Sequence, residues 1–193
     1  MEQPDQHALV ALGILDMIED GAFIFCPESL RFSYVNQGAV RQTGYSRVEL
    51  LGMTPLNLKL EFSETQFRQM LEPLVRGEVR TVRLSTTHRC KDGHYSPVEV
   101  ILQYLTSNNA ASNIVAIVRD IADRKEAEKS LQTQKDFLNT ILESEPECVK
   151  VISTNGKLLQ MNRAGLEMLE VDDLKEAQQT GLISFVHPED QPA

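Results

Sequence analysis

The sequence is poor in several residue types, and each shortage excludes a class of protein. Its 193 residues contain no tryptophan and only three cysteines. The cysteines are far apart and form no CxxC pair, so we expect reduced thiols and a cytoplasmic protein, not a disulfide framework or a zinc site. No apolar run approaches the roughly 18 residues that a membrane span requires, so we expect no membrane-spanning segment.

Positive charge and catalytic motifs are scarce as well. Asp and Glu outnumber Lys and Arg by 28 to 19, which gives a net charge of −9, whereas a nucleic-acid surface needs a basic stripe. The sequence has no glycine-rich phosphate loop, GxSxG elbow or HExxH motif. We interpret the histidines beside Cys90 (His88 and His94) and His187 of a His-Pro-Glu-Asp segment as structural. We therefore expect no nucleic-acid partner, no catalytic residues and no metal site.

One internal repeat organises the chain. Asn36 aligns without a gap with Asn162, 126 residues further on, and Tyr34-Val35 aligns with Gln160-Met161. The period exceeds the 20 to 50 residues of solenoid repeats, so it indicates two copies of one domain type. We predict an N-terminal amphipathic helix over 1–20, a complete domain over 21–122, a helical connector over 123–146 and an incomplete second domain over 147–193.

Apolar periodicity predicts the fold of the complete domain. It indicates two strands at 23–26 and 32–35, short helices up to residue 77 around an irregular stretch at 52–62, and three strands over 79–121, the first two joined by an Asp92-Gly93 turn. This order predicts an α+β fold with one five-stranded antiparallel sheet flanked by helices. The last two strands are apolar on both faces, so we expect the N-terminal helix or a partner subunit to cover the outer face.

Four short segments carry a family resemblance. They are Tyr34-Val35-Asn36, Thr43-Gly44-Tyr45-Ser46, Arg89-Cys90-Lys91-Asp92-Gly93 and Asp120-Ile121-Ala122-Asp123-Arg124-Lys125. In this order and spacing, residues 20–125 resemble a PAS domain of the bacterial sensory type, and residues 152–157, Asn162 and 186–190 resemble the first half of another. The resemblance implies a sensory or interaction module of a signalling protein, with a histidine kinase, cyclic-dinucleotide synthase or transcription factor as output.

The resemblance also implies an apolar pocket between helices and sheet. Its candidate ligand-binding residues, which are equally explained as plain core, are Phe23, Phe25, Tyr34, Phe67, Met70, Leu71, Leu84 and Ile101. The family's flavin–cysteine adduct is disfavoured because residues 55–66 contain no cysteine, and haem because residues 53–79 contain no histidine. The missing tryptophan argues against the family's redox flavin sensors. The cofactor is left unknown, and a small-molecule ligand is left open.

The connector predicts a dimer. Between Asp120 and Pro146 there is no Gly or Pro, a composition that favours one continuous helix. Its seam residues step 4-3-4-3, as in a coiled coil, and are Ala127, Leu131, Gln134, Leu138 and Ile141. We expect a parallel homodimer, the alternative being a helix that lies on its own domain.

The strand-to-helix junction before the connector is the expected signal relay, through Asp120, Ile121 and Arg124. Asp120 should anchor the start of the helix, with Arg119 or Arg124 as its partner. The sequence thus favours a non-catalytic sensory and dimerisation module that relays a signal to a downstream domain. The alternatives are a cofactor-loaded sensor of oxygen, redox state or light, and a catalytic fragment, which lacks a paired nucleophile and base.

Overall fold

The computed structural model describes residues 13–59, 61–106 and 112–180. The chain divides into two compact units, Met1–Glu126 and Ala127–Ala193. Helix is present at residues 13–17, inside the predicted N-terminal helix. The rest of that helix before residue 13, and the segment around His187, lie outside the described residues.

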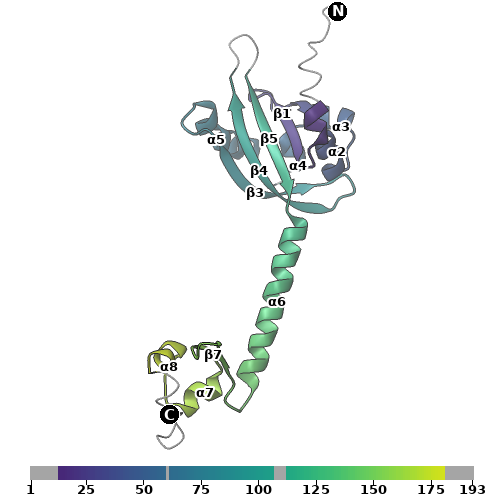
Figure 1. The fold of residues 1–193 in the computed structure, drawn as a ribbon. Coiled ribbons are helices and arrows are strands. Elements are labelled where there is room, and N and C mark those ends of the chain that lie inside the picture. The colour runs from purple at the N-terminus through teal and green to yellow at the C-terminus, as the bar shows by residue number, and fades with distance from the viewer. Residues whose placement is uncertain (1–12, 60, 107–111, 181–193) are drawn as a thin grey trace, which may run out of the picture. The chain divides into compact units, whose positions relative to one another are not determined.

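A five-stranded antiparallel sheet forms the first unit (Figure 1). Its strands are β1 (Gly21–Phe25), β2 (Phe32–Val35), β3 (Val82–Arg89), β4 (Tyr95–Leu105) and β5 (Asn113–Asp120). The spatial order is β2-β1-β5-β4-β3, so the first strand pairs with the last one in the middle of the sheet. The predicted fold class is confirmed. The expected Asp-Gly turn joins β3 to β4, and Gly93 supplies its positive φ of 90°.

Four helices connect β2 to β3, and polar caps fix where most of them begin. They are α2 (Gln37–Thr43), α3 (Arg47–Leu51), α4 (Pro55–Leu58) and α5 (Glu64–Val75). Ser46 and Ser63 form capping boxes with the residue three positions on, and Asn36 caps α2. The expectation of an irregular stretch over 52–62 is wrong for α4: proline fits the first turn of a helix, and Asn57 accepts a hydrogen bond from the Thr54 N–H.

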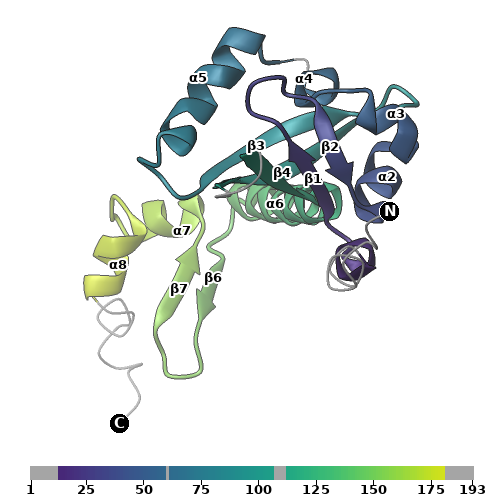
Figure 2. The same cartoon turned by 90° about the horizontal axis from the view of Figure 1, so that it is seen from above.

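All four helices pack on one face of the sheet (Figure 2). They contribute Ala39, Leu50, Leu58 and Phe67 to the same buried cluster as Phe23 of β1. Along β4, Val98, Val100 and Leu102 face this cluster, whereas the residues between them face outward and are half-buried. Whether the N-terminal helix or a partner subunit covers that outer face stays a prediction.

The second unit repeats the first half of the first. Its elements are β6 (Lys150–Ile152), β7 (Leu158–Met161), α7 (Arg163–Met168) and α8 (Leu174–Thr180). β7 lies 126 residues after β2, and the left-handed residue in each hairpin turn matches as well, Leu30 with Gly156. Leu158, Met161 and Ala177 form a small core. The internal repeat in the sequence therefore reflects a repeated structure.

The connector is a single helix, α6 (Ala122–Ser144), of 23 residues. It buries none of its residues. Neither α6 nor any other helix of the described residues is apolar enough over sufficient length to cross a bilayer.

Candidate functional site: core cavity and helix junctions

A small cavity lies between the sheet and α4 and α5. The centre of a water-sized sphere can occupy about 20 Å³ of it, roughly the space of one water molecule. The lining residues are Phe23, Phe25, Phe32, Pro55, Leu58, Lys59, Phe67, His88, Val100, Leu102, Ala116 and Val118. Of the candidate ligand-binding residues, Phe23, Phe25 and Phe67 line it.

Two candidates, Tyr34 and Ile101, lie on the opposite face of the sheet, and their assignment to the pocket is wrong. A bulge in the β1–β2 pairing shifts the register, so that Val35 lies opposite Phe23 on the inner face and Tyr34 lies opposite Ile24 on the outer one. Ile101 alternates with the inner residues of β4 and pairs with Ile117. Neither side chain reaches the cavity.

The remaining three candidates pack in the core without lining the cavity. Leu71 is buried, whereas Met70 and Leu84 are partly buried against the same cluster. Leu84 lies on the inner face of β3 opposite Val100. These three side chains are therefore part of the hydrophobic core, which is the other explanation for them.

Two residues that line the cavity, Lys59 and His88, are not among the residues predicted from the sequence. Each is 4% exposed and lines the cavity. Burial lowers the pKa of Lys59 to about 8 and that of His88 to about 3, with the nearby Lys59 charge adding to the effect on His88. The alternation of β3, where Thr86 and His88 are the buried positions, is the sequence pattern that points to His88.

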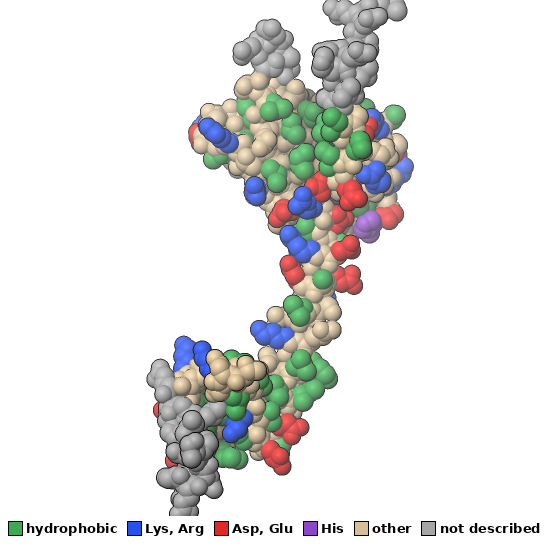
Figure 3. Space-filling model, in the orientation of Figure 1, with side chains coloured by type: hydrophobic (Ala, Val, Ile, Leu, Met, Phe, Trp, Pro, Cys, Tyr) green, Lys and Arg blue, Asp and Glu red, His purple; other side chains and the backbone are tan. Residues whose placement is uncertain are grey.

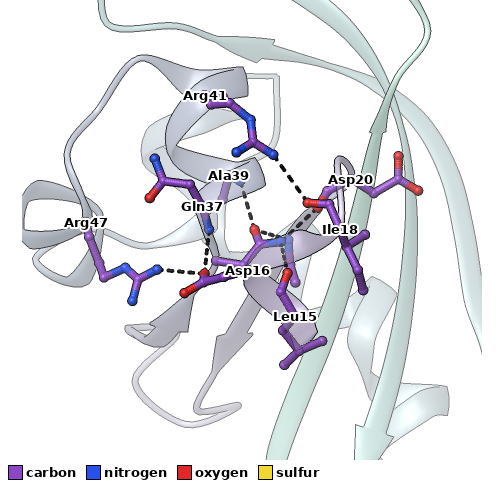
Figure 4. Close-up of polar contacts among 10 residues, drawn as sticks. Leu15, Asp16, Ile18, Asp20, Gln37, Ala39, Arg41 and Arg47 are labelled. Carbon is purple, nitrogen blue, oxygen red and sulfur yellow. Dashed lines mark hydrogen bonds and ion pairs between the residues drawn. The ribbon is translucent and has the colours of Figure 1, made fainter. Parts of the chain in front are cut away.

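A polar junction at Asn36 ties the segment that precedes β1 to the domain, and Figure 4 labels its partners Leu15, Asp20 and Ala39. The Asn36 side chain is fully buried. Its oxygen accepts from the N–H groups of Ala22 and Ala39, each at 2.8 Å, and its amide donates to the carbonyls of Leu15 at 2.8 Å and Asp20 at 3.0 Å. One side chain thereby holds the last turn of the helix, the first strand and the start of α2.

Asp16 adds a second tie at the same junction. Its carboxylate accepts from the Gln37 N–H at 2.8 Å and from the Arg47 guanidinium at 2.7 Å (Figure 4). The bond from Arg47 lowers the pKa of Asp16. The helix is thus held through its backbone carbonyls and through a charged side chain.

The second unit builds the same junction on the end of α6. Asn162 accepts from the N–H groups of Val149 and Gly165 and donates to carbonyls that include those of Leu142 and Glu147. Asn162 therefore binds the end of α6 in the same way that Asn36 binds the end of the N-terminal helix.

The charged tie is repeated too. Glu143 of α6 accepts from the Arg163 N–H at 3.0 Å, as Asp16 accepts from the Gln37 N–H. Both halves of the junction, an asparagine and an acid on the preceding helix, therefore occur in each unit.

The start of α6 is fixed by Asp120. Its carboxylate accepts from the Ser96 hydroxyl and the Ala122 N–H, each at 2.8 Å, so the expected anchoring role has a structural basis. Of the two expected arginine partners, Arg119 is wrong, because it points to the other face of β5 and forms an ion pair with Asp20 at 2.8 Å, whereas Arg124 as the partner stays a prediction.

The other two expected relay residues also lie at this junction. Ile121 is 3% exposed, and its N–H bonds to the Pro97 carbonyl. Arg124 approaches Glu99 at 3.8 Å. Strand β4 therefore contacts residues 120–124, where β5 passes into α6, through Ser96, Pro97 and Glu99.

The predicted seam lies on the exposed surface of α6. Leu131, Leu138 and Ile141 are 68%, 58% and 42% exposed, and Phe137 beside them is 65% exposed. Ala127 and Gln134 are exposed as well. Apolar side chains are visible along the helix in Figure 3, so the chain leaves an uncovered apolar stripe on α6.

Neither metal nor the family's larger cofactors fit the described residues. No group of three or more His, Cys, Asp or Glu side chains in that part of the chain is arranged to hold a metal ion. The cavity, about 20 Å³ in size, is far too small for haem or flavin and has no thiol in its lining.

Comparison with known proteins places these features in a family. A family model described as a PAS domain matches residues 19–123. Among curated proteins, none matches this sequence.

Three solved structures show the same fold. A PAS domain from a two-component sensor histidine kinase is 22% identical, with coverage of 61% of this chain and 99% of its own and a TM-score of 0.51. The PAS domain of an HTR-like protein from Haloarcula marismortui is 20% identical, with coverage of 60% and 93% and a TM-score of 0.54. A domain of a sensory box sensor histidine kinase/response regulator from Geobacter sulfurreducens is 22% identical, with coverage of 59% and 94% and a TM-score of 0.51. Because the family match spans more than half of the sequence and the sheet has the same architecture, this chain belongs to the PAS domain family.

Proposed function

We propose that the chain is a non-catalytic sensory and dimerisation module of a signal-transduction protein, which acts as a cytoplasmic homodimer. It relays a change in the first unit through α6 to an output domain of the same polypeptide, of the histidine kinase or cyclic-dinucleotide enzyme class. One observation carries the proposal: a helix with an uncovered apolar stripe is anchored by polar contacts at both of its ends.

The relay path begins at the sheet and ends at the first turn of α6. Asp20 accepts from Asn36 through its carbonyl and from Arg119 through its carboxylate. The next residue of β5, Asp120, caps α6 and is itself held by Ser96 of β4. A shift of β4 against β5 therefore moves the groups that orient the helix.

The dimer follows from the stripe on α6. Exposed apolar side chains in a 4-3-4-3 spacing are stable in water when a second helix covers them, and a second copy supplies the same spacing. Gln134 in the middle of the stripe favours one register over others. A pair of α6 helices can transmit rotation or displacement because polar contacts fix both ends of each helix, Asp120 at the start and Asn162 at the end.

Charge substitutions in the seam test this proposal. Leu131→Asp and Leu138→Asp should each weaken the dimer by about 3 kcal/mol, or roughly a hundredfold in Kd, because a carboxylate would be buried against an apolar surface. Sedimentation equilibrium measures the change. Thr133→Asp places the same charge on the same helix away from the seam and should leave the Kd unchanged.

The result that contradicts the proposal is equally specific. If both leucine variants associate like the parent, or if Thr133→Asp weakens the dimer as much as they do, the seam does not form the interface. The alternative of a flavin or haem sensor requires the cavity to expand greatly, and the absorption spectrum of the purified protein separates it from the proposed function.

A further inference from the structure

The cavity contains two polar side chains for which its other lining residues supply no partner. Lys59 and His88 are each 4% exposed, and the ten other lining residues are apolar. Phe23 meets the His88 imidazole edge-on, with ring centroids 6.4 Å apart. Polar groups of this kind are costly to bury without a partner, so their presence requires a reason.

Lys59 lies at the C-terminal end of α4 and forms no ion pair within the described residues. The nearest acid along the chain, Glu61, accepts a hydrogen bond from Thr86. Its charge opposes the effect of burial on the pKa of Lys59 but does not overcome it. A buried ammonium without a counter-ion costs several kcal/mol, and an anion beside it recovers part of that cost.

His88 also lacks a partner for a buried polar atom. Its Nε2 atom is fully buried and has no hydrogen-bond partner among the described residues. Because the imidazole is neutral at physiological pH, one ring nitrogen carries a proton and can donate it to an acceptor. With its proton on Nε2, the imidazole is a second donor beside the Lys59 ammonium, on otherwise apolar walls.

We propose that this cavity binds a small monocarboxylate, whose two oxygens accept from Lys59 Nζ and His88 Nε2 and whose hydrocarbon or aromatic body packs on Phe23, Phe25 and Phe67. The inference rests on the proposed sensory function and names the chemical class of its ligand. Two donors match the two oxygens of one carboxylate, whereas phosphate carries more charge and more acceptors than the described lining satisfies.

The size of the cavity sets the size of the ligand. The space open to a water-sized sphere is about 20 Å³, and the whole gap between atoms, including its solvent-filled mouth, is about 290 Å³. The enclosed space holds about one water molecule, and ligand pockets begin at about 300 Å³, so the ligand is no larger than a one-ring acid and its entry requires the cavity to widen. α4, a helix of four residues that contributes Pro55 and Leu58 to the lining, is the element that we expect to move.

Isothermal titration calorimetry of the full chain with benzoate and with benzamide tests the inference. Both probes have the same ring, but only benzoate carries the charge. For the parent we expect benzoate to bind at least about tenfold more tightly than benzamide, since hydrogen bonds to charged groups contribute about 1.5–3 kcal/mol.

Lys59→Met retains the length of the side chain and removes the charge. It should lower the benzoate affinity to that of benzamide, and it should fold at least as stably as the parent because it removes a buried ammonium. Lys125→Met, an exposed lysine of α6, is the matched control and should bind benzoate like the parent.

Three outcomes would overturn the inference: no binding of benzoate, equal binding of benzoate and benzamide by the parent, or unchanged benzoate binding by Lys59→Met. None of them affects the proposed relay, whose test is the dimer seam. Conversely, selective benzoate binding together with unaffected association of Leu131→Asp and Leu138→Asp would retain the ligand class and refute the relay.

Discussion

Replacement of Asn36 by alanine should destabilise the first unit by about 4 kcal/mol, because each of its hydrogen bonds contributes about 1 kcal/mol net. The side chain makes four hydrogen bonds of 2.8–3.0 Å and is fully buried. The bonds from the Ala22 and Ala39 N–H groups are buried and those to the Leu15 and Asp20 carbonyls are partly buried, so solvation should recover only part of the loss.

Two further variants test whether the loss of stability comes from the hydrogen bonds of Asn36. Asn57→Ala removes an asparagine from an exposed cap, that of α4, and should cost only about 1 kcal/mol. Asn36→Asp retains the two acceptor bonds and loses the two donor bonds to Leu15 and Asp20. It should weaken the attachment of the helix at residues 13–17, which Asp16 still ties to Gln37 and Arg47, while α2 stays capped.

The assay is urea unfolding followed by tyrosine fluorescence. The chain has four tyrosines and no tryptophan, and all four (Tyr34, Tyr45, Tyr95 and Tyr104) lie in the first unit. The fluorescence therefore reports on that unit alone. A loss of stability for Asn36→Ala no larger than that for Asn57→Ala would refute the view that this junction holds the unit together.

Two more predictions concern groups that burial perturbs. The pKa of His88 is about 3 in the folded chain and about 6.5 when unfolded, so the unfolded state binds more protons between these values. Stability should fall as the pH drops below 6.5, by about 2 kcal/mol at pH 5. This slope in urea titrations should vanish in His88→Leu and persist in His94→Leu, and parallel slopes for parent and His88→Leu would contradict the assignment. Burial and the charges of Asp92 and Asp120 raise the pKa of the Cys90 thiol, so iodoacetamide should alkylate it at least about tenfold more slowly than Cys26. Mass spectrometry of digests measures both rates, and equal rates would show that Cys90 is accessible.

The features that were predictable from sequence are those set by local chemistry. Asn36 and Asn162 signal the same turn because the side-chain requirement of a helix cap is local. Ser63 with Gln66 marks the start of α5, and Asp92-Gly93 marks the hairpin, for similar reasons. The repeat at 126 residues strengthens each of these assignments because it shows the pattern twice.

The errors arise where tertiary register decides. Strict alternation places Tyr34 on the inner face, but the bulge between Ile24 and Phe25 reverses the phase. Arg119 is a natural candidate partner for Asp120 because the two are adjacent, yet neighbours on a strand point to opposite faces. Strand alternation alone therefore excludes Arg119, whereas the position of Tyr34 depends on how β1 pairs with β2.

The polar lining of the cavity escapes prediction for a different reason. Apolar character selects candidates for a pocket, and Lys59 in a turn between helices has the composition of a surface residue. Only the packing of α4 against β3 brings it beside His88. A buried lysine is therefore found from the fold and not from hydropathy.

The asparagine junction has an evolutionary consequence. In each unit, the asparagine donates to backbone carbonyls of the preceding helix, which every sequence provides, and one acid of that helix accepts a backbone N–H. A duplicated segment of 126 residues therefore already contains the asparagine that binds the preceding helix. The helix that follows one copy is then bound by the next copy. Strings of such domains can lengthen by simple copying, with no new joint to evolve.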